Sequence, residues 1–285
     1  MQGITPRATM LNPELVKSAR EAALGSAIAC GIEVEDVVDL DAIENVRNLV
    51  GTIWGPEIVP PRNFLKAITL AGSCVLLARR NNETVGFGIG IVGWDNGLHF
   101  HSHQIGIVAP ERGSGIGFAL KLAQRARCLA HGITEMRWTF DPLLSPNAHF
   151  NLGRLGATIV DFHPNCYGSR TDTFNTDDVT DRIRVSWKLD QPVGPITPTS
   201  SPKGPALIET TPDVRRSFQS PIAGAYISIP EDYQRLRTND RATADAWRVA
   251  VGEAMRDVFS TGLGLRGFGD FGYGVSSQTL KSDSQ

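Results

Sequence analysis

The chain has 285 residues, of which 41% are hydrophobic and 20% are charged, a composition typical of globular proteins rather than disordered or fibrous ones. Its formal net charge is −2 and its pI is about 6.3, so we expect neither a nucleic-acid surface nor a polybasic membrane patch. The four cysteines are widely spaced, the N-terminus has no apolar core, and no apolar run approaches the ~20 residues of a membrane span. These features predict a cytoplasmic protein with reduced thiols and no signal peptide.

Hydrophobic periodicity predicts helices first, then three antiparallel strands, then helices alternating with strands. Asn12 and Asp41 are expected to cap the first two helices. Asp95-Asn96-Gly97 predicts a tight hairpin, because Asn and Gly tolerate positive φ. The glycines of strand 84–94 indicate bulges or close backbone approach. The expected helices are 13–30, 42–54, 61–70, 115–131 and 145–155, and the expected strands are 32–40, 74–79, 84–94, 98–108, 136–140, 158–162 and 182–189.

A proline-rich stretch divides the chain. Residues 190–205 contain five prolines and two glycines, which predicts an extended linker. Residues 206–285 follow with an expected strand, a mainly helical stretch over 231–260 and a closing strand. A segment of this size has a small core, so we expect it to pack on a first domain formed by residues 1–189.

The most informative motif is Arg112-Gly113-Ser114-Gly115-Ile116-Gly117, between strand 98–108 and helix 115–131. Glycines at a strand-to-helix junction expose backbone N–H groups, and a helix start favours anions, so the motif predicts a phosphate or pyrophosphate site. A dinucleotide loop and a Walker loop both fit poorly, because Phe118 stands where each needs Gly or Lys. A flexible turn without a ligand remains the plain alternative.

The same residues fit a third pattern, R/Q-x-x-G-x-G/A, through Arg112, Gly115 and Gly117. This hexad resembles the pyrophosphate loop of the GNAT acyltransferase superfamily, which binds acyl-coenzyme A. The element order over about residues 32–189 is similar to the GNAT plan, in which the fourth and fifth strands separate around the pantetheine arm. The resemblance implies an α/β fold: a mixed, mostly antiparallel sheet flanked by helices, with a small C-terminal α/β extension.

Longer strings in the second half resemble a less-studied branch of predicted GNAT acetyltransferases with such an extension. Some members of that branch look like amino-acid N-acyltransferases, so the resemblance implies a small amine as the acceptor. The strings are Ser102-His103, Phe140-Asp141-Pro142-Leu143, Asn147-Ala148-His149-Phe150-Asn151, Leu155-Gly156-Ala157, Asn165-Cys166-Tyr167-Gly168, Ile227-Ser228-Ile229-Pro230-Glu231-Asp232 and Ala246-Trp247-Arg248.

The resemblance also implies which residues would hold the co-substrate, acetyl-CoA or another acyl-CoA. Backbone groups of Ile107 and Val108 would hold the pantetheine. Asn147 and Asn151, four apart on a predicted helix, would bind its amides or the acceptor; their alternative roles are helix capping and solvent exposure. The pyrophosphate would lie on the amides of Arg112, Gly113, Ser114, Gly115, Ile116 and Gly117.

Acyl transfer to an amine needs a base and a way to stabilise the leaving thiolate. His99, His101 and His103 alternate along one strand and share a face. His103, nearest the glycine loop, would be the base. A metal site and a set of ordinary strand histidines are the alternatives, and we expect no metal.

Three further residues are candidates for the site. Asp141 ends strand 136–140 and would bind the acceptor ammonium or take its proton; a turn cap is its alternative role. The helix position where GNAT enzymes place an acidic tyrosine holds Leu152, so Tyr167 would substitute unless it is simply a packed aromatic. Arg248 would hold an acceptor carboxylate or, alternatively, dock the C-terminal segment.

Together these features predict an acyl-CoA-dependent N-acyltransferase that acts by direct transfer, without a covalent enzyme intermediate. Acetyl is the first expectation for the acyl group. A non-catalytic acyl-CoA-binding or scaffolding module with a GNAT fold is the main alternative, because of Leu152, and a metal-dependent enzyme is the third. A homodimer is left open, and nucleic acid and membrane partners are not expected.

Overall fold

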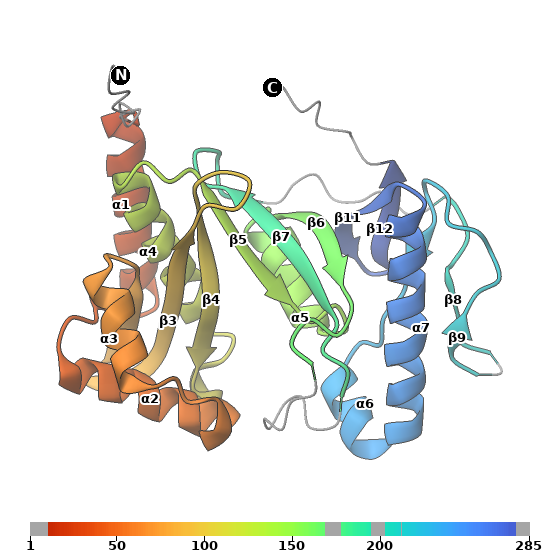
Figure 1. Cartoon of the computed structure of the whole chain (residues 1–285), viewed down its shortest axis with the longest axis horizontal. Coiled ribbons are helices and arrows are strands. Elements are labelled where there is room, and N and C mark those ends of the chain that lie inside the picture. Colours follow the sequence, from red (N-terminus) through yellow and green to blue (C-terminus); the bar gives the residue numbers. More distant parts are fainter. Residues whose placement is uncertain (1–10, 169–177, 195–202, 212, 278–285) are drawn as a thin grey trace, which may run out of the picture. The chain divides into compact units, whose positions relative to one another are not determined.

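The computed structural model (Figure 1) describes residues 11–168, 178–194, 203–211 and 213–277. The predictions for the extreme N-terminus and for the middle of the proline-rich linker lie outside these residues. Packing divides the chain into two compact units: the first holds the chain up to Trp138 together with Lys188–Pro192, and the second holds most of the rest. The predicted boundary at residues 190–205 stays a prediction.

The fold class is confirmed as α/β with a largely antiparallel seven-stranded sheet, ordered β1-β2-β3-β4-β5-β7-β6. Strands β1 to β4 pair antiparallel in succession, β6 pairs antiparallel with β7, and β4 pairs in parallel with β5. The strands are β1 Glu33–Asp36, β2 Val75–Arg80, β3 Glu83–Gly93, β4 His99–Ile107, β5 Glu135–Phe140, β6 Thr158–His163 and β7 Arg182–Lys188.

In the first unit, two helix pairs cover the two faces of the sheet (Figure 1). On one face, α1 (Pro13–Ala29) packs beside α4 (Ile116–Ala130). On the other, α2 (Leu40–Trp54) and α3 (Arg62–Leu70) cover an apolar cluster. Residues of this cluster that are buried in the core include Ile43, Val46, Leu65, Leu77, Phe87 and Ile89.

The glycines of β3 make room for neighbouring side chains, and one of the predicted bulges lies at Gly90, where the register with β4 shifts. A Cβ at Gly86 would press against Ile107 and Ile116, and a Cβ at Gly90 would overlap the ring of Phe100. Close approach of neighbouring side chains therefore requires glycine at these positions.

Local signals set most element ends. Asn12 accepts a hydrogen bond from the Glu14 N–H, as predicted for the cap of α1. The cap of α2 is Asp39 rather than the predicted Asp41, because Asp39 is extended and its carboxylate accepts the Ala42 N–H at 2.7 Å. The turn between β3 and β4 has positive φ at Asn96 and Gly97, as predicted.

In the second unit, the predicted helix 145–155 divides into α5 (Ser145–Ala148) and a π-helix (His149–Arg154). The predicted helical stretch 231–260 divides at Asp240, whose carboxylate caps α7. Helix α7 packs against β11, and β11 forms a small sheet in the order β10-β12-β11. The C-terminal elements are β8 Ile208–Glu209, β9 Arg215–Arg216, β10 Tyr226–Ile227, α6 Tyr233–Asn239, α7 Arg241–Ser260, β11 Leu263–Gly269 and β12 Gly272–Ser277.

None of the helices in the described part of the chain has the length and apolar character needed to span a membrane.

Candidate functional site

The ladder between β4 and β5 is short. Phe100 pairs with Met136 and His101 pairs with Arg137, and in the described chain the register between the two strands ends there. Strand β4 continues to Ile107, paired on its other side with β3. Beyond His101, this edge of β4 therefore turns backbone N–H and C=O groups toward partners other than β5. Early separation of these two strands is what the GNAT resemblance implies.

A β-bulge lies where the two strands separate. Ile89 pairs with Gln104 but the next residue, Gly90, pairs with Ser102, so His103 is the extra residue on β4. A bulge twists its strand and redirects a side chain, and bulges are frequent beside active sites. The sequence suggested bulges only through the glycines of β3, and gave no sign that His103 would be the bulged residue.

The glycine motif combines left-handed backbone conformations with the start of a helix. A 3₁₀ turn (Ala109–Glu111) leads from β4 into the loop, and Gly113 and Gly115 have φ of +82° and +95°. Gly115 is the N-cap of α4 and provides no side-chain cap. The first amides of a helix have no partner within the helix. The start of α4 can therefore donate N–H groups to an anion, and the pyrophosphate site stays a prediction.

Contacts from α1 and β2 hold the glycine loop in place. The Cys30 thiol donates to the Ser114 carbonyl at 3.4 Å. Arg80 donates to the Cys30 carbonyl at 2.7 Å and pairs with Glu111, and the Ser114 hydroxyl donates to the Glu111 carbonyl at 2.6 Å. These long-range contacts, which the sequence did not indicate, hold the loop in its observed conformation.

The three histidines of β4 differ in environment. His99 is buried, and its Nδ1 lies 2.9 Å from the Gly97 carbonyl oxygen. His101 is half-buried, His103 is exposed, and the centroids of these two rings lie 6.2 Å apart. Within the described residues, no group of three side chains is arranged to hold a metal. His103 is thus the histidine of this strand that a ligand reaches most easily.

Asp141 and Arg248, predicted separately, form one buried ion pair in the second unit. The Arg248 guanidinium donates two hydrogen bonds to the Asp141 carboxylate, at 2.8 and 2.7 Å. Burial by itself would raise the pKa of Asp141, but Arg248 and Arg182 lower it below its ordinary value. A carboxylate held in this way is a weak base, and its guanidinium partner has little capacity left for a substrate.

Tyr167 lies next to the end of β5. Its hydroxyl is 2.9 Å from that of Thr139, and its ring centroid is 5.6 Å from the Arg182 guanidinium carbon. The residue is 41% exposed. Leu152 occupies the helix position at which the GNAT resemblance leads us to expect an acidic tyrosine. It is buried and has no acidic group.

The π-helix alters the predicted relation between Asn147 and Asn151. Asn147 is exposed at the end of α5, whereas Asn151 is buried in the π-helix. A four-residue spacing places two side chains on one face only when the α-helix is continuous. Of the two, Asn147 is accessible to a ligand.

Sequence reasoning missed a buried polar centre between α4 and the sheet. The Lys121 Nζ donates to the Ser102 hydroxyl at 2.9 Å and lies 3.5 Å from the centroid of the Trp138 ring. Burial lowers the pKa of Lys121 well below its ordinary value. The Ser102 hydroxyl also donates to Gln124, whose Nε2 has no partner among the described residues. A lysine among the apolar residues of α4 was the available signal.

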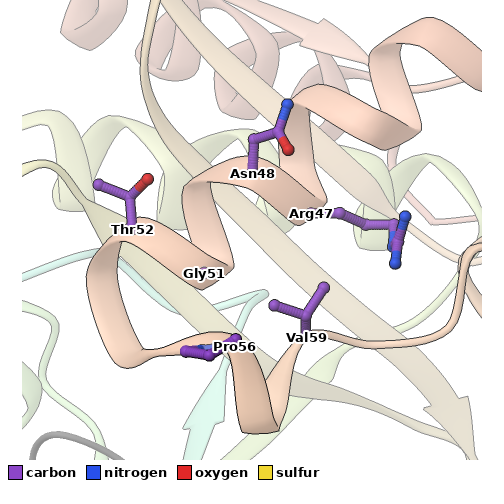
Figure 2. Close-up of a pocket in the computed structure, with 6 residues that line it drawn as sticks. All are labelled: Arg47, Asn48, Gly51, Thr52, Pro56 and Val59. Carbon is purple, nitrogen blue, oxygen red and sulfur yellow. The ribbon is translucent and has the colours of Figure 1, made fainter.

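A cavity of about 480 Å³ lies elsewhere in the first unit, over α2 (Figure 2). Its lining contains none of the predicted site residues. Arg47, at one side of it, donates to the Pro60 carbonyl at 3.0 Å. The cavity is therefore not part of the predicted site. The lining residues are Arg47, Asn48, Gly51, Thr52, Pro56 and Val59.

No protein-family model matches this sequence, and no curated protein matches it either. The chain is similar in structure to acetyltransferases. Naa50 of Arabidopsis thaliana, solved with the bisubstrate analogue CoA-Ac-MVNAL, is 20% identical, with 55% of this chain and 97% of that chain covered and a TM-score of 0.42. The ribosomal-protein-S18-alanine N-acetyltransferase of Escherichia coli is 11% identical, with 56% and 96% covered and a TM-score of 0.45. A GNAT-family acetyltransferase of Elizabethkingia anophelis with acetyl-CoA bound is 15% identical, with 55% and 98% covered and a TM-score of 0.40.

Proposed function

We propose that this protein transfers an acyl group, acetyl in the first instance, from an acyl-CoA to the amine of a small molecule or amino acid. The observation that carries the proposal is the start of α4, which has no side-chain cap and follows Gly113 and Gly115 at positive φ. The loop before it follows β4, and in the described chain the ladder between β4 and β5 has two residue pairs. Such a helix start suits a pyrophosphate. The open edge of β4 suits the amides of a pantetheine arm.

In this proposal the loop binds the pyrophosphate through the amides of Gly113 and of residues 115–117, and the backbone of Ile107 binds the arm. The Arg112 and Ser114 N–H groups donate to carbonyls within the loop, and the N–H and carbonyl of Val108 are bonded to Val85 and Glu111, so these predicted contacts are not retained. The thioester then lies along β4 near the bulge at His103. Asn147 is a further contact for the arm; Asn151, which is buried, supports its helix instead.

The chemistry needs no covalent enzyme intermediate. The amine nitrogen attacks the thioester carbonyl carbon, the carbon–sulfur bond breaks, and the amine loses a proton. In this proposal His103, exposed at the bulge, accepts this proton, and Tyr167 protonates the thiolate. Asp141 and Arg248 bind each other, so we now assign them to the support of the site rather than to the acceptor.

The alternative is a module that binds acyl-CoA without catalysis. Two observations favour it: Leu152 replaces the usual acidic tyrosine, and the Asp141 carboxylate is paired. The transferase and the binding module would both bind coenzyme A at the glycine loop. Only the transferase would also release thiol in the presence of an amine. A cytoplasmic location, the absence of a metal, and homodimer formation stay predictions.

The test measures free thiol released from acetyl-CoA, propionyl-CoA and succinyl-CoA with a panel of amines and amino acids, beside calorimetric binding of coenzyme A. Amine-dependent thiol release that falls about 10²-fold in His103→Ala supports the transferase. His131→Ala, at the exposed end of α4, is the matched control and should leave the rate unchanged. Binding without turnover supports the module, and absence of binding refutes both.

A further inference from the structure

Arg248 is the centre of a buried ionic cluster in the second unit. Besides its two bonds to Asp141, its guanidinium donates to the two carboxylate oxygens of Asp178 at 3.1 and 3.0 Å. The Tyr233 hydroxyl donates to Asp178 at 3.0 Å, and the Tyr233 ring lies 4.9 Å from the guanidinium carbon. Arg248 is only 4% exposed. One planar cation therefore holds two carboxylates in fixed directions.

The first carboxylate belongs to the turn that follows β5. Asp141 accepts the N–H of Leu143 at 3.0 Å through its side chain and the N–H of Leu144 at 3.2 Å through its carbonyl. The Tyr273 hydroxyl, from β12, donates to the Pro142 carbonyl at 2.8 Å. The turn 141–144 leads directly into α5 and Asn147. Residues from the C-terminal segment thus fix the start of the helix to which the proposed function assigns a pantetheine contact.

The second carboxylate belongs to the segment before β7, and this segment supports Tyr167. Thr180, two residues after Asp178, accepts the Tyr167 N–H at 2.9 Å through its hydroxyl. Asp181 accepts the Asn165 N–H at 2.9 Å. The segment 178–181 therefore braces the turn 165–168, which holds the hydroxyl of Tyr167 2.9 Å from that of Thr139.

Arg248 accordingly joins two supports of the proposed reaction, the turn that precedes α5 and the segment that carries the turn of Tyr167. Buried ion pairs add little net stability, because desolvation offsets the attraction, but their directional bonds fix geometry. A lysine would keep the positive charge, yet it has no planar fork with which to hold both carboxylates. The arrangement is better suited to alignment than to stability.

We propose that Arg248 is a positioning residue for acyl transfer, and that the C-terminal segment is a working part of the site through it. The proposal rests on the proposed function. Displacement of a catalytic group by about 1 Å can cost about 10²-fold in rate. The glycine loop belongs to the first unit and Arg248 to the second, so we expect binding of acyl-CoA at the loop to change little.

The experiment compares Arg248→Lys with Arg235→Lys, a control on the neighbouring helix α6 whose residue is exposed. For Arg248→Lys we expect a fall in kcat of roughly 10- to 100-fold, with the KM for acyl-CoA within about threefold of the wild type. Amide hydrogen exchange at Leu143 and Tyr167 should become at least about tenfold faster. Arg235→Lys should change none of these. An equal fall in kcat for both variants, or unchanged exchange at both amides, overturns the proposal.

Two outcomes need separate readouts. If the wild type releases no thiol with any donor and amine, the proposed function fails, and faster exchange at Leu143 and Tyr167 in Arg248→Lys shows that the cluster still positions these turns. If Arg248→Lys does not fold, Asp178→Asn replaces it, since this change keeps the bonds to Asp141. Reduced kcat with a native melting temperature in Asp178→Asn supports positioning. Failure of both variants to fold overturns it in favour of a purely structural role.

Discussion

Replacing Gly115 by alanine tests the glycine loop, because two separate costs coincide at this position. The residue has φ of +95°, in the left-handed region, which costs a residue with a Cβ about 1–2 kcal/mol. A Cβ would also lie 3.0 Å from the Cys30 sulfur, closer than such atoms normally approach. A combined cost of about 2 kcal/mol corresponds to a factor of about 30 in an equilibrium constant.

If the loop rearranges to escape this strain, coenzyme A binding weakens by a similar factor. We expect Gly115→Ala to raise the Kd of coenzyme A by about 10- to 50-fold in calorimetric titrations. Gly113→Ala separates the two costs, because Gly113 has φ of +82° but open space around its Cβ position. Its Kd should rise by only about 5- to 10-fold, from the backbone strain alone.

Adding Cys30→Ala to Gly115→Ala removes the steric contact but leaves the backbone strain. The double variant should therefore recover to the level of Gly113→Ala and no further. Full recovery would show that φ at residue 115 does not matter to binding. Wild-type affinity in Gly115→Ala itself would refute the assignment of the loop as the pyrophosphate site.

Two predictions concern the core of the first unit. In Gly90→Ala the new methyl overlaps the buried Phe100 ring and should lower the free energy of unfolding by about 3 kcal/mol. In the matched control Gly88→Ala, the new Cβ meets the Gln124 Nε2 at 3.3 Å and should lower the free energy of unfolding by less than ~1 kcal/mol. Urea denaturation measures the free energy of unfolding of both variants. Equal decreases in the two variants would contradict the packing argument. Because burial lowers the pKa of Lys121, the unfolded chain binds more protons than the folded chain between the lowered pKa and the ordinary lysine value. Wild-type stability should therefore rise with pH across that window, by at most about 1.4 kcal/mol per unit. Lys121→Met should be more stable by about 1–3 kcal/mol at neutral pH and should lack this rise; parallel pH profiles would contradict the assignment.

Local sequence signals predicted most of the fold. Asn12 and Pro13 begin α1, and Asn96-Gly97 turns β3 into β4, because capping and positive φ depend on a few adjacent residues. The glycine loop was found in the same way. Its pattern lies within six consecutive positions between a strand and a helix, so its backbone conformation could be inferred without knowledge of the rest of the chain.

Other features depended on residues that the sequence does not place together. The cap of α2 moved from Asp41 to Asp39, and the helix after residue 145 became partly a π-helix. His103 became a bulge because the register of β4 against β3 shifts by one residue. Two nearby residues can each cap a helix, and two adjacent registers can each pair a strand. Packing with the rest of the chain decides between such alternatives, and a local sequence pattern contains no information about that packing.

The sequence by itself determined the order of elements, the turns and the backbone conformation of the glycine loop, because each follows from the conformational preferences of a few adjacent residues. Only the tertiary structure decided that Asp141 and Arg248, 107 positions apart, neutralise each other, and that Cys30 supports Ser114. Such pairs form because buried charges and polar groups must find partners wherever the fold provides them. Which residues become partners therefore depends on the packing of the whole fold.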